Sequence, residues 1–275
     1  MDFKLLALGL ILFFCSSLAS ADINERYHLS MGQTLLFFNS KFGINSRDNS
    51  IDSTIDLEND LNYDRQVDAA WISGWYRTGD NHRLKITYIP VRRSSFLQNT
   101  RDIEIDNTLI KSGAFMTSNT RSDIVDFSYI YSLHKADQIE VGFSAGIYWL
   151  LNTTKVIVAG EIIPADSNQP VFKADYFTQQ KLQAPMPLFG LDVNYELNAN
   201  WRTRASFRYL AVQINEIDGE ILSTELATEY YFNNNWGIGA SVSAFNLNVN
   251  VEGIISTTSL TWAYDGIQLY AVYKY

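Results

Sequence analysis

After residue 22, long stretches of the chain alternate apolar or aromatic residues with polar ones at every second position. The alternation is clearest over residues 139–149, 189–197, 202–211 and 222–232. Side chains two apart in a β-strand lie on the same face, so this spacing predicts strands with one apolar and one polar face. The sequence therefore predicts an all-β fold.

The connections between the predicted strands alternate between short and mostly longer segments. Four tight polar turns are expected, at Thr78–Asn81, Lys135–Asp137, Asn198–Asn200 and Asn233–Asn235. The other connections are expected at Asn45–Arg65, Ser94–Arg121, Thr153–Ala184, Ile217–Glu220 and Val251–Gly253. Short periplasmic turns and longer extracellular loops are typical of an up-and-down antiparallel transmembrane β-barrel of the bacterial outer membrane.

Four periplasmic turns imply five hairpins and hence ten strands, with eight or twelve as alternatives. The expected strands are residues 30–44, 66–77, 82–94, 122–133, 138–152, 186–197, 201–215, 221–232, 236–250 and 256–275. Aromatic residues flank the tight turns, as in the girdles that barrels place at the membrane boundary. The last strand finishes on Tyr273 and Tyr275, which resemble the terminal aromatic signal read by the outer-membrane assembly machinery. Within this strand, Asp265–Gly266 predicts a β-bulge that shifts the phase of the outward residues.

Composition supports the barrel and excludes two other classes. The mean hydropathy is -0.10, far below that of a helical membrane protein, and no segment after the N-terminal leader is a transmembrane helix candidate. A barrel alternates lipid-facing and lumen-facing residues, so its average hydropathy resembles that of a soluble protein. The net charge of -9 argues against a nucleic-acid partner, which needs a basic footprint.

Residues 1–21 have the features of a signal peptide. Lys4 is followed by the apolar run Leu5–Phe14, and Ala19–Ala21 matches a small-x-small cleavage site. The only cysteine, Cys15, lies within this leader and follows the bulky Phe14, which does not suit a lipobox. We predict a signal peptide over 1–21 and one barrel domain over 22–275, without a thiol or disulfide in the mature chain.

Charged residues on the predicted lumen face form the main candidate site. On consecutive strands these are Asp192, Glu196, Arg202, Arg204, Arg208, Glu225 and Glu229, with Arg83, Lys85 and Asp126 on earlier strands. Opposite charges on neighbouring strands pair across the ladder, and the planar guanidinium suits two-pronged binding of carboxylates. The set is compatible with a stabilising polar core and also with a selective constriction for a small solute. A barrel of ten strands is barely wider than the eight-stranded size that side chains fill.

Histidine placement bears on catalysis. Enzymes built on outer-membrane barrels resemble one another in needing a histidine, because a base that titrates near neutral pH must accept a proton from the nucleophile or from water. The predicted topology puts His82 and His134 at periplasmic turns, and His28 near the periplasmic start of the first strand. None would reach an extracellular site, so we predict that the chain is not an enzyme.

The predicted loops carry three features of interest. The first loop holds Asp48, Asp52, Asp56, Glu58, Asp60 and Asp64, but their spacing does not follow an EF-hand. We predict a solvated acidic loop, or one that divalent ions bridge to lipopolysaccharide phosphates, without a specific metal site or a cofactor. The second loop and its edges hold Arg92, Arg93, Arg101, Lys111 and Arg121, which suit contacts with lipopolysaccharide phosphates and are equally compatible with ordinary loop charges. Residues 153–184 are apolar for a surface loop, and they could extend the strands, fold into the barrel mouth or contact a partner.

Four short segments are similar to sequences of a broad group of uncharacterised proteobacterial outer-membrane β-barrel proteins. They are Ile55–Leu61, Asn81–Leu84, Ala184–Leu191 and Gly266–Tyr270. The resemblance implies a barrel and an outer-membrane address, and it implies no particular chemistry. We therefore predict a non-enzymatic outer-membrane barrel, either a narrow channel for small solutes or a structural barrel. The alternative is a protein that displays its loops for adhesion or partner binding. Its expected partners are outer-membrane lipid, lipopolysaccharide and the assembly machinery, and the solute or surface partner is left open.

Overall fold

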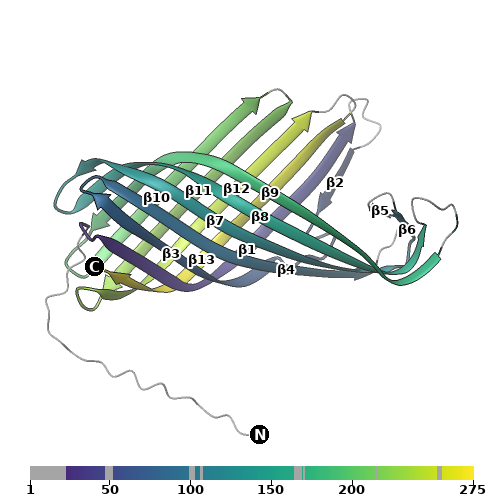
Figure 1. Ribbon diagram of the computed structural model, residues 1–275, viewed down its shortest axis with the longest axis horizontal. Coiled ribbons are helices and arrows are strands. Elements are labelled where there is room, and N and C mark those ends of the chain that lie inside the picture. Colours follow the sequence, from purple (N-terminus) through teal and green to yellow (C-terminus); the bar gives the residue numbers. More distant parts are fainter. Residues whose placement is uncertain are drawn as a thin grey trace, which may run out of the picture.

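Ten long strands close into an antiparallel barrel in the computed structural model, which describes residues 23–46, 52–98, 103–105, 108–163, 169, 171–214, 216–252 and 256–275 (Figure 1). The barrel strands are β1 (Tyr27–Ser46), β3 (Gln66–Gly79), β4 (His82–Gln98), β7 (Phe115–Lys135), β8 (Ile139–Ile163), β9 (Val171–Glu196), β10 (Trp201–Ile214), β11 (Ile217–Tyr231), β12 (Trp236–Glu252) and β13 (Ser256–Lys274). Each pairs with its neighbour, and pairing of β1 with β13 closes the ring. The shorter strands β2 (Asp52–Asp56), β5 (Ile103–Ile105) and β6 (Thr108–Ile110) lie in the connections. The predicted fold class and the strand number are confirmed.

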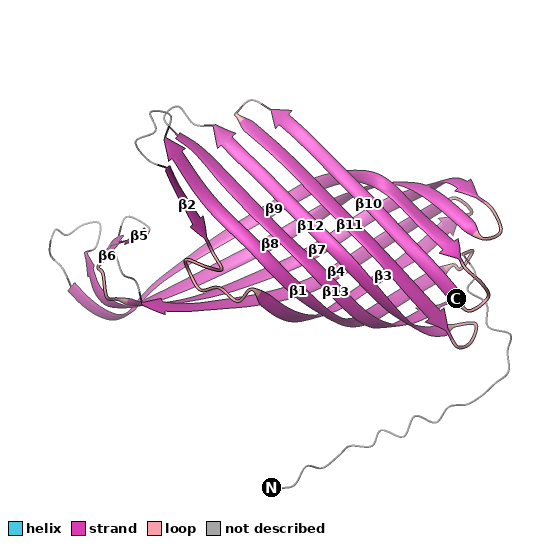
Figure 2. Cartoon of the chain, turned by 180° about the vertical axis from the view of Figure 1, so that it is seen from behind, coloured by secondary structure: helices cyan, strands magenta, loops and turns pink. Residues whose placement is uncertain are grey.

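The four tight turns lie at one end of the barrel, together with the C-terminus (Figure 2). Two of them are built on an asparagine whose side chain replaces a backbone acceptor. Asn198 Oδ1 accepts hydrogen bonds from the backbone N–H groups of Asn200 and Trp201, at 2.9 and 3.1 Å. Asn233 Oδ1 does the same for Asn235 and Trp236, at 2.9 and 2.7 Å. Short turns mark the periplasmic end of an outer-membrane barrel, so the opposite end faces the outside of the cell.

The outer wall is apolar and the inner wall carries most of the polar groups, as lipid on the outside requires. Neighbouring outward residues form rows across the sheet, and one such row is Ile86, Phe127 and Ile147 on β4, β7 and β8. All three side chains are exposed on the isolated barrel. Nearer the tight turns the outward residues are aromatic, including Tyr129, Tyr195, Trp201, Tyr230 and Trp236. Among the residues that the structure describes, no helix is long and apolar enough to cross a membrane.

One wall of the barrel is much taller than the rest. Strands β8 and β9 contain 25 and 26 residues, whereas a transmembrane strand needs about 9–11. Together with β4 and β7 they extend past the other strands on the side away from the tight turns (Figure 1). Most of the predicted loop at 153–184 is thus the continuation of β8 and β9, which is one of the three arrangements left open by the sequence.

The β-bulge predicted at Asp265–Gly266 is wrong. The pairing of β13 with β1 and with β12 runs through this pair without a shift. Trp262 and Tyr264, before the pair, lie on the same inward phase as Gln268 and Tyr270 after it, and all four side chains are buried.

Candidate functional site in the barrel lumen

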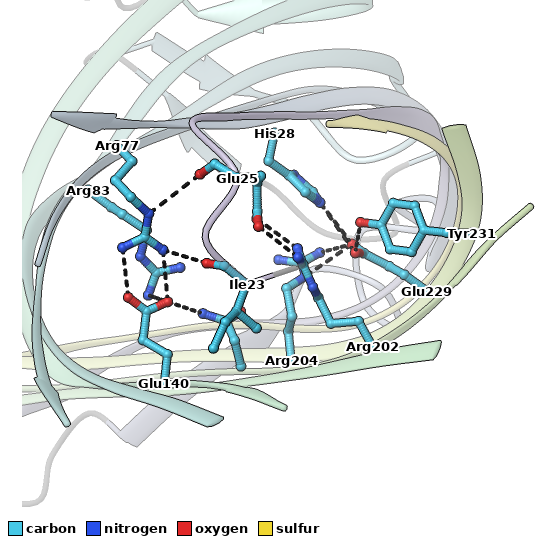
Figure 3. Close-up of polar contacts among 11 residues, drawn as sticks. Ile23, Glu25, His28, Arg77, Arg83, Glu140, Arg202, Arg204, Glu229 and Tyr231 are labelled. Carbon is cyan, nitrogen blue, oxygen red and sulfur yellow. Dashed lines mark hydrogen bonds and ion pairs between the residues drawn. The ribbon is translucent and has the colours of Figure 1, made fainter. Parts of the chain in front are cut away.

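The periplasmic end of the lumen is occupied by the residues that precede β1. Ile23 and Glu25 are buried inside the barrel, between two clusters of charged side chains (Figure 3). Arg77 donates to the backbone oxygens of both residues, at 2.8 Å for Ile23 and 3.4 Å for Glu25. Arg202 holds the Glu25 carboxylate with two hydrogen bonds of 2.7 Å. We call residues Ile23–Glu25 the plug segment.

On one side of the plug segment, Glu140 collects several positive and polar groups. Arg77 binds its two carboxylate oxygens at 2.9 and 3.0 Å, and Arg83 lies 3.5 Å away. The Asn194 amide donates to Glu140 at 3.3 Å, and Ser132 donates to it as well. Glu140 is fully buried, so these partners replace the water that a carboxylate otherwise needs.

On the other side, Glu229 is the shared acceptor. Arg204 lies 2.8 Å from its carboxylate, His28 3.2 Å, and the Tyr231 hydroxyl donates at 2.7 Å (Figure 3). The Tyr270 hydroxyl also donates to Glu229, at 3.2 Å. The His28 ring also stacks on Trp75 at a centroid distance of 3.5 Å.

Glycine makes room for one of these groups. A Cβ atom at Gly239 would lie 2.3 Å from the Tyr270 ring, so only a residue without a side chain lets that ring lie flat against β12. This close approach brings the Tyr270 hydroxyl onto Glu229.

Further up the lumen, Arg208 spans the barrel from β10 to Asp126 on β7. One contact measures 2.9 Å, and Ser128 donates to Asp126 at 2.8 Å. Lys85 and Glu225 form a second pair at 3.4 Å. Asp192 lies with Lys85 and Glu225 around a small cavity of about 20 Å³.

The structure therefore places the predicted charged residues in the lumen and brings most of them together. Glu196 lies opposite Arg202 in the β9–β10 ladder. The sequence predicted ion pairs between neighbouring strands. Arg208 and Arg202 instead bind Asp126 and Glu25, which lie on distant elements. Three charged members of the network were not singled out from the sequence: Glu25, Arg77 and Glu140. His28 was named only as a histidine near the periplasmic end. Glu140 falls on the polar phase of the 139–149 alternation, which could have identified it.

An aromatic layer separates these charges from the upper lumen. Its members are Phe38, Tyr148, Phe245, Trp262 and Tyr264, all of them buried. Phe245 stacks on Tyr148 at 4.3 Å and on Tyr264 at 5.5 Å, and the two tyrosine hydroxyls are hydrogen-bonded at 3.1 Å. We call this layer the aromatic floor.

Above the aromatic floor lies a cavity of about 660 Å³. Its wall is mostly apolar and includes Leu150, Leu182, Met186, Leu210, Val212, Ile221, Leu247, Val249, Leu260 and Trp262. We call it the cup. Apolar residues inside a barrel are the reverse of a water-filled pore, whose interior is polar.

Residues 52–65, which we call the cap, close the side of the cup between β1 and β4, and their Ile55, Leu57, Leu61 and Tyr63 line the cavity. The cap is fastened to the wall by Arg93, which forms a buried ion pair with Glu58 and donates to the backbone oxygen of Asp64 at 3.1 Å. The Glu58 carboxylate also accepts from the backbone N–H of Ser40 at 2.8 Å.

The predicted acidic loop is not solvated throughout, because Glu58 is buried in its ion pair with Arg93. Asp56 accepts from the backbone N–H of Asn59, and Asp48 lies outside the described residues. His82 accepts from or donates to the Tyr129 hydroxyl at 2.6 Å on the outer wall. In the described part of the chain, no group of three or more His, Cys, Asp or Glu residues could hold a metal ion.

The predicted assembly signal lies at the seam of the barrel. The Tyr275 backbone oxygen accepts from the N–H groups of Arg26 and Tyr27, at 2.7 and 2.8 Å, and the Tyr275 N–H donates to Tyr27 at 2.9 Å. The Tyr273 ring packs outward against Trp236 at 4.9 Å. The predicted signal peptide, residues 1–21, lies outside the described residues.

No protein-family model and no curated protein matches the chain. Among solved structures, it is similar to the outer membrane protease OmpT from Escherichia coli, with a TM-score of 0.51, 12% identity, and coverage of 90% of this chain and 97% of that chain. OprG from Pseudomonas aeruginosa matches with a TM-score of 0.34, 10% identity, and coverage of 94% and 98%. Ail from Yersinia pestis matches with a TM-score of 0.31, 8% identity, and coverage of 89% and 99%. At these identities the likeness concerns the fold.

The closed barrel, its lipid-facing wall and the likeness to OmpT define the class: this is an integral β-barrel protein of the bacterial outer membrane. The same comparison contradicts the prediction that the chain is not an enzyme, because OmpT is a protease on a similar barrel. That prediction rested on the distance of the histidines from the extracellular end. Their positions do not exclude catalysis on such a barrel, and we withdraw it.

Proposed function

We propose that this outer-membrane protein binds a small apolar molecule in the cup. The observation that carries the proposal is the cavity of about 660 Å³, which has a mostly apolar wall, the aromatic floor beneath it and the cap at its side. Sites for small ligands are typically concave, mostly apolar cavities of about 300–1,000 Å³. Apolar surface facing water is unfavourable, so an apolar occupant would be stabilised there by the hydrophobic effect.

The lower lumen supports binding from the cell surface over free passage. Below the aromatic floor, the cavities around the ion pairs measure only about 50 and 20 Å³. Arg202 and Glu140 are fully buried there, and the plug segment fills the periplasmic end. A molecule that enters the cup from outside therefore meets a closed base.

The expected affinity is modest. Drug-sized ligands gain about 0.3 kcal/mol per non-hydrogen atom. A ligand of about 20 such atoms would thus bind with roughly 6 kcal/mol, which corresponds to a Kd of tens of micromolar. Titrations should cover this range.

The test is a binding titration of the purified barrel in lipid nanodiscs with alkylbenzenes and long-chain alcohols of about 20 non-hydrogen atoms, followed by saturation-transfer NMR. Ala184 lines the cup, and an Ala184→Trp substitution should fill part of it and weaken binding at least tenfold. The matched control is Ala211→Trp, because Ala211 is exposed on the outer wall of β10. Ligand that partitions into the nanodisc lipid adds the same background signal to the titrations of both variants. Equal binding by the two variants would refute the proposal.

A second candidate function, a gated channel, is favoured by one observation: the plug segment is a separate piece of chain held by side chains of the wall rather than part of a barrel strand. Its release would unblock the periplasmic end of the lumen, and the aromatic floor would be the remaining barrier to open. In planar bilayers, the wild-type barrel is expected to be closed, and a Glu25→Gln variant should show brief openings because it loses the ion pair with Arg202. Identical closed traces for both proteins would count against the channel.

A further inference from the structure

A depression on the outer wall of the barrel, separate from the lumen, is rich in positive charge. Its lining includes Arg92, Asn119, Arg121, Thr153, Lys155 and Gln179, from strands β4, β7, β8 and β9. The ladder sets these residues in adjacent rows: Arg92 is paired with Arg121 and Arg121 with Thr153, while Asn119 is paired with Lys155 and Lys155 with Gln179. All of them fall on the outward phase of their strands.

The register also fixes the height of this depression relative to the membrane. Reading up the outer wall of β8, the lipid-facing Ile147 is followed by Trp149, then Leu151, Thr153 and Lys155. Tyr88 on β4, Val125 on β7 and Trp149 on β8 are neighbours in one row across the sheet. Tyr and Trp residues mark the boundary between lipid and water, so this row lies at that boundary. Four residues from Trp149 to Thr153 span about 14 Å along the strand, or roughly 10 Å along the membrane normal at the usual strand tilt. The basic rows therefore lie at headgroup depth, on the side away from the tight turns.

The charge of the depression is unbalanced. Arg92 and Arg121 share one carboxylate, Asp123, at 3.2 and 2.6 Å. The Tyr88 hydroxyl donates to the same carboxylate at 3.0 Å, so Asp123 orients both guanidinium groups from the membrane boundary. The two arginine side chains nevertheless stay 49% and 59% exposed, which leaves their remaining N–H groups accessible to an anion. Lys155 is exposed in the next row, and Lys181 is exposed beside Thr153.

We infer that this depression binds a phosphate group of the phosphorylated glycolipid in the outer leaflet. Guanidinium groups bind phosphate through paired, charge-assisted hydrogen bonds, and an ammonium group adds a point charge. A lipid-borne phosphate fits the position, because the acyl chains of the same molecule would lie along the apolar rows directly below. Hydroxyl and amide side chains of Thr153, Asn119 and Gln179 are suited to sugar hydroxyls around the phosphate. The outward side chains of the site do not line the cup, although the two cavities share Arg93 and Thr120 in their walls.

The experiment measures binding of purified deep-rough lipopolysaccharide to the detergent-solubilised full-length barrel by native mass spectrometry and microscale thermophoresis. The Arg121→Gln/Lys155→Gln variant should bind about 10- to 30-fold more weakly than wild type. The matched control is Lys41→Gln/Lys135→Gln, which removes the same charge from β1 and from the tight-turn end, and it should bind like wild type. Thermal unfolding of each variant checks that the barrel is intact.

Three further ligands separate the possible sources of the phosphate. Enzymatically dephosphorylated lipopolysaccharide should bind wild type as weakly as intact lipopolysaccharide binds the double variant. Inorganic phosphate alone and phosphatidylglycerol should both bind more weakly than the glycolipid. Equal binding of the dephosphorylated lipid, of inorganic phosphate or of phosphatidylglycerol would overturn the assignment, and so would wild-type affinity in the double variant.

Discussion

The Arg208–Asp126 pair tests whether the lumen charges hold the barrel together. Both side chains are more than nine-tenths buried, and the pair joins β10 to β7 across the lumen. Removing one partner of a buried ion pair typically costs 3–5 kcal/mol, because the other charge is left without compensation. Here Ser128 still donates to Asp126 at 2.8 Å after loss of Arg208, so we expect Arg208→Met to lie at the lower end, about 3 kcal/mol.

The second half of the cycle removes both charges. An Asp126→Leu/Arg208→Met double variant leaves no unpaired charge, and apolar replacements of buried ion pairs are often neutral or stabilising. The double variant should thus be more stable than Arg208→Met alone, with a coupling energy of at least about 2 kcal/mol. Urea unfolding in phospholipid vesicles, followed by tryptophan fluorescence and gel mobility, measures all four proteins.

The control is Arg121→Met, which breaks a solvent-exposed pair on the outer wall and should leave the unfolding midpoint close to wild type. An Arg208→Met variant as stable as this control would refute the structural role of the lumen network. A wild-type midpoint combined with altered ion selectivity would instead identify the pair as a constriction.

Three other predictions address the cap and the seam. Glu58→Gln should weaken binding of apolar ligands several-fold while the barrel stays folded, because the cap loses its ion pair with Arg93; the same NMR titration measures this. The backbone N–H of Asn59 donates to Asp56 and holds the pKa of this carboxylate below its ordinary value of 3.8. Because the pKa is lowered, the ionised Asp56 carboxylate stabilises the cap fully above pH 3.8, and this stabilisation is lost as the pH falls through the pKa of the folded protein. The NMR signal of the Asn59 amide should therefore broaden only in strong acid in the wild type. In Asp56→Ala it should already be broad at neutral pH. Deletion of Tyr275 should slow assembly into the outer membrane, because it removes three backbone hydrogen bonds between the chain ends and the predicted recognition signal; pulse-chase folding in cells would reveal unchanged kinetics if this reasoning is wrong.

The strands were predictable because lipid outside and polar groups inside impose a period of two. Arg202, Arg204 and Arg208 fall on the inward phase for this reason, and their burial follows from it. Their partners were less accessible to the same reasoning. Glu25 precedes the first strand and has no periodic context, so its contact with Arg202, 177 residues away, depends on the closed barrel. The sequence also left open whether β8 and β9 continue above the membrane. Apolar residues continue at alternate positions there, although no lipid contacts that part of the strands.

The aromatic floor escaped detection for a different reason. Period-two reasoning assigns apolar and aromatic residues to the lipid face, whereas Trp262 and Tyr264 point into the barrel. Their outward neighbours Thr261, Ala263 and Asp265 are small or polar, so the usual polarity of the two faces is reversed in this part of β13. Only the register with β12 and β1 shows which face points inward.

The order of the layers in the lumen links the proposed binding to the closed state. The cup is apolar, the aromatic floor lies directly beneath it, and the ion pairs lie below the floor. An apolar ligand in the cup therefore contacts aromatic rings and avoids the charges, while the charges are compensated among themselves. Ion passage would require the reverse: water would have to enter the cup, the floor would have to open and the plug segment would have to leave. Because a bound ligand displaces that water, occupancy of the cup and conduction through the barrel should exclude each other, and an apolar ligand should shorten any openings that Glu25→Gln produces.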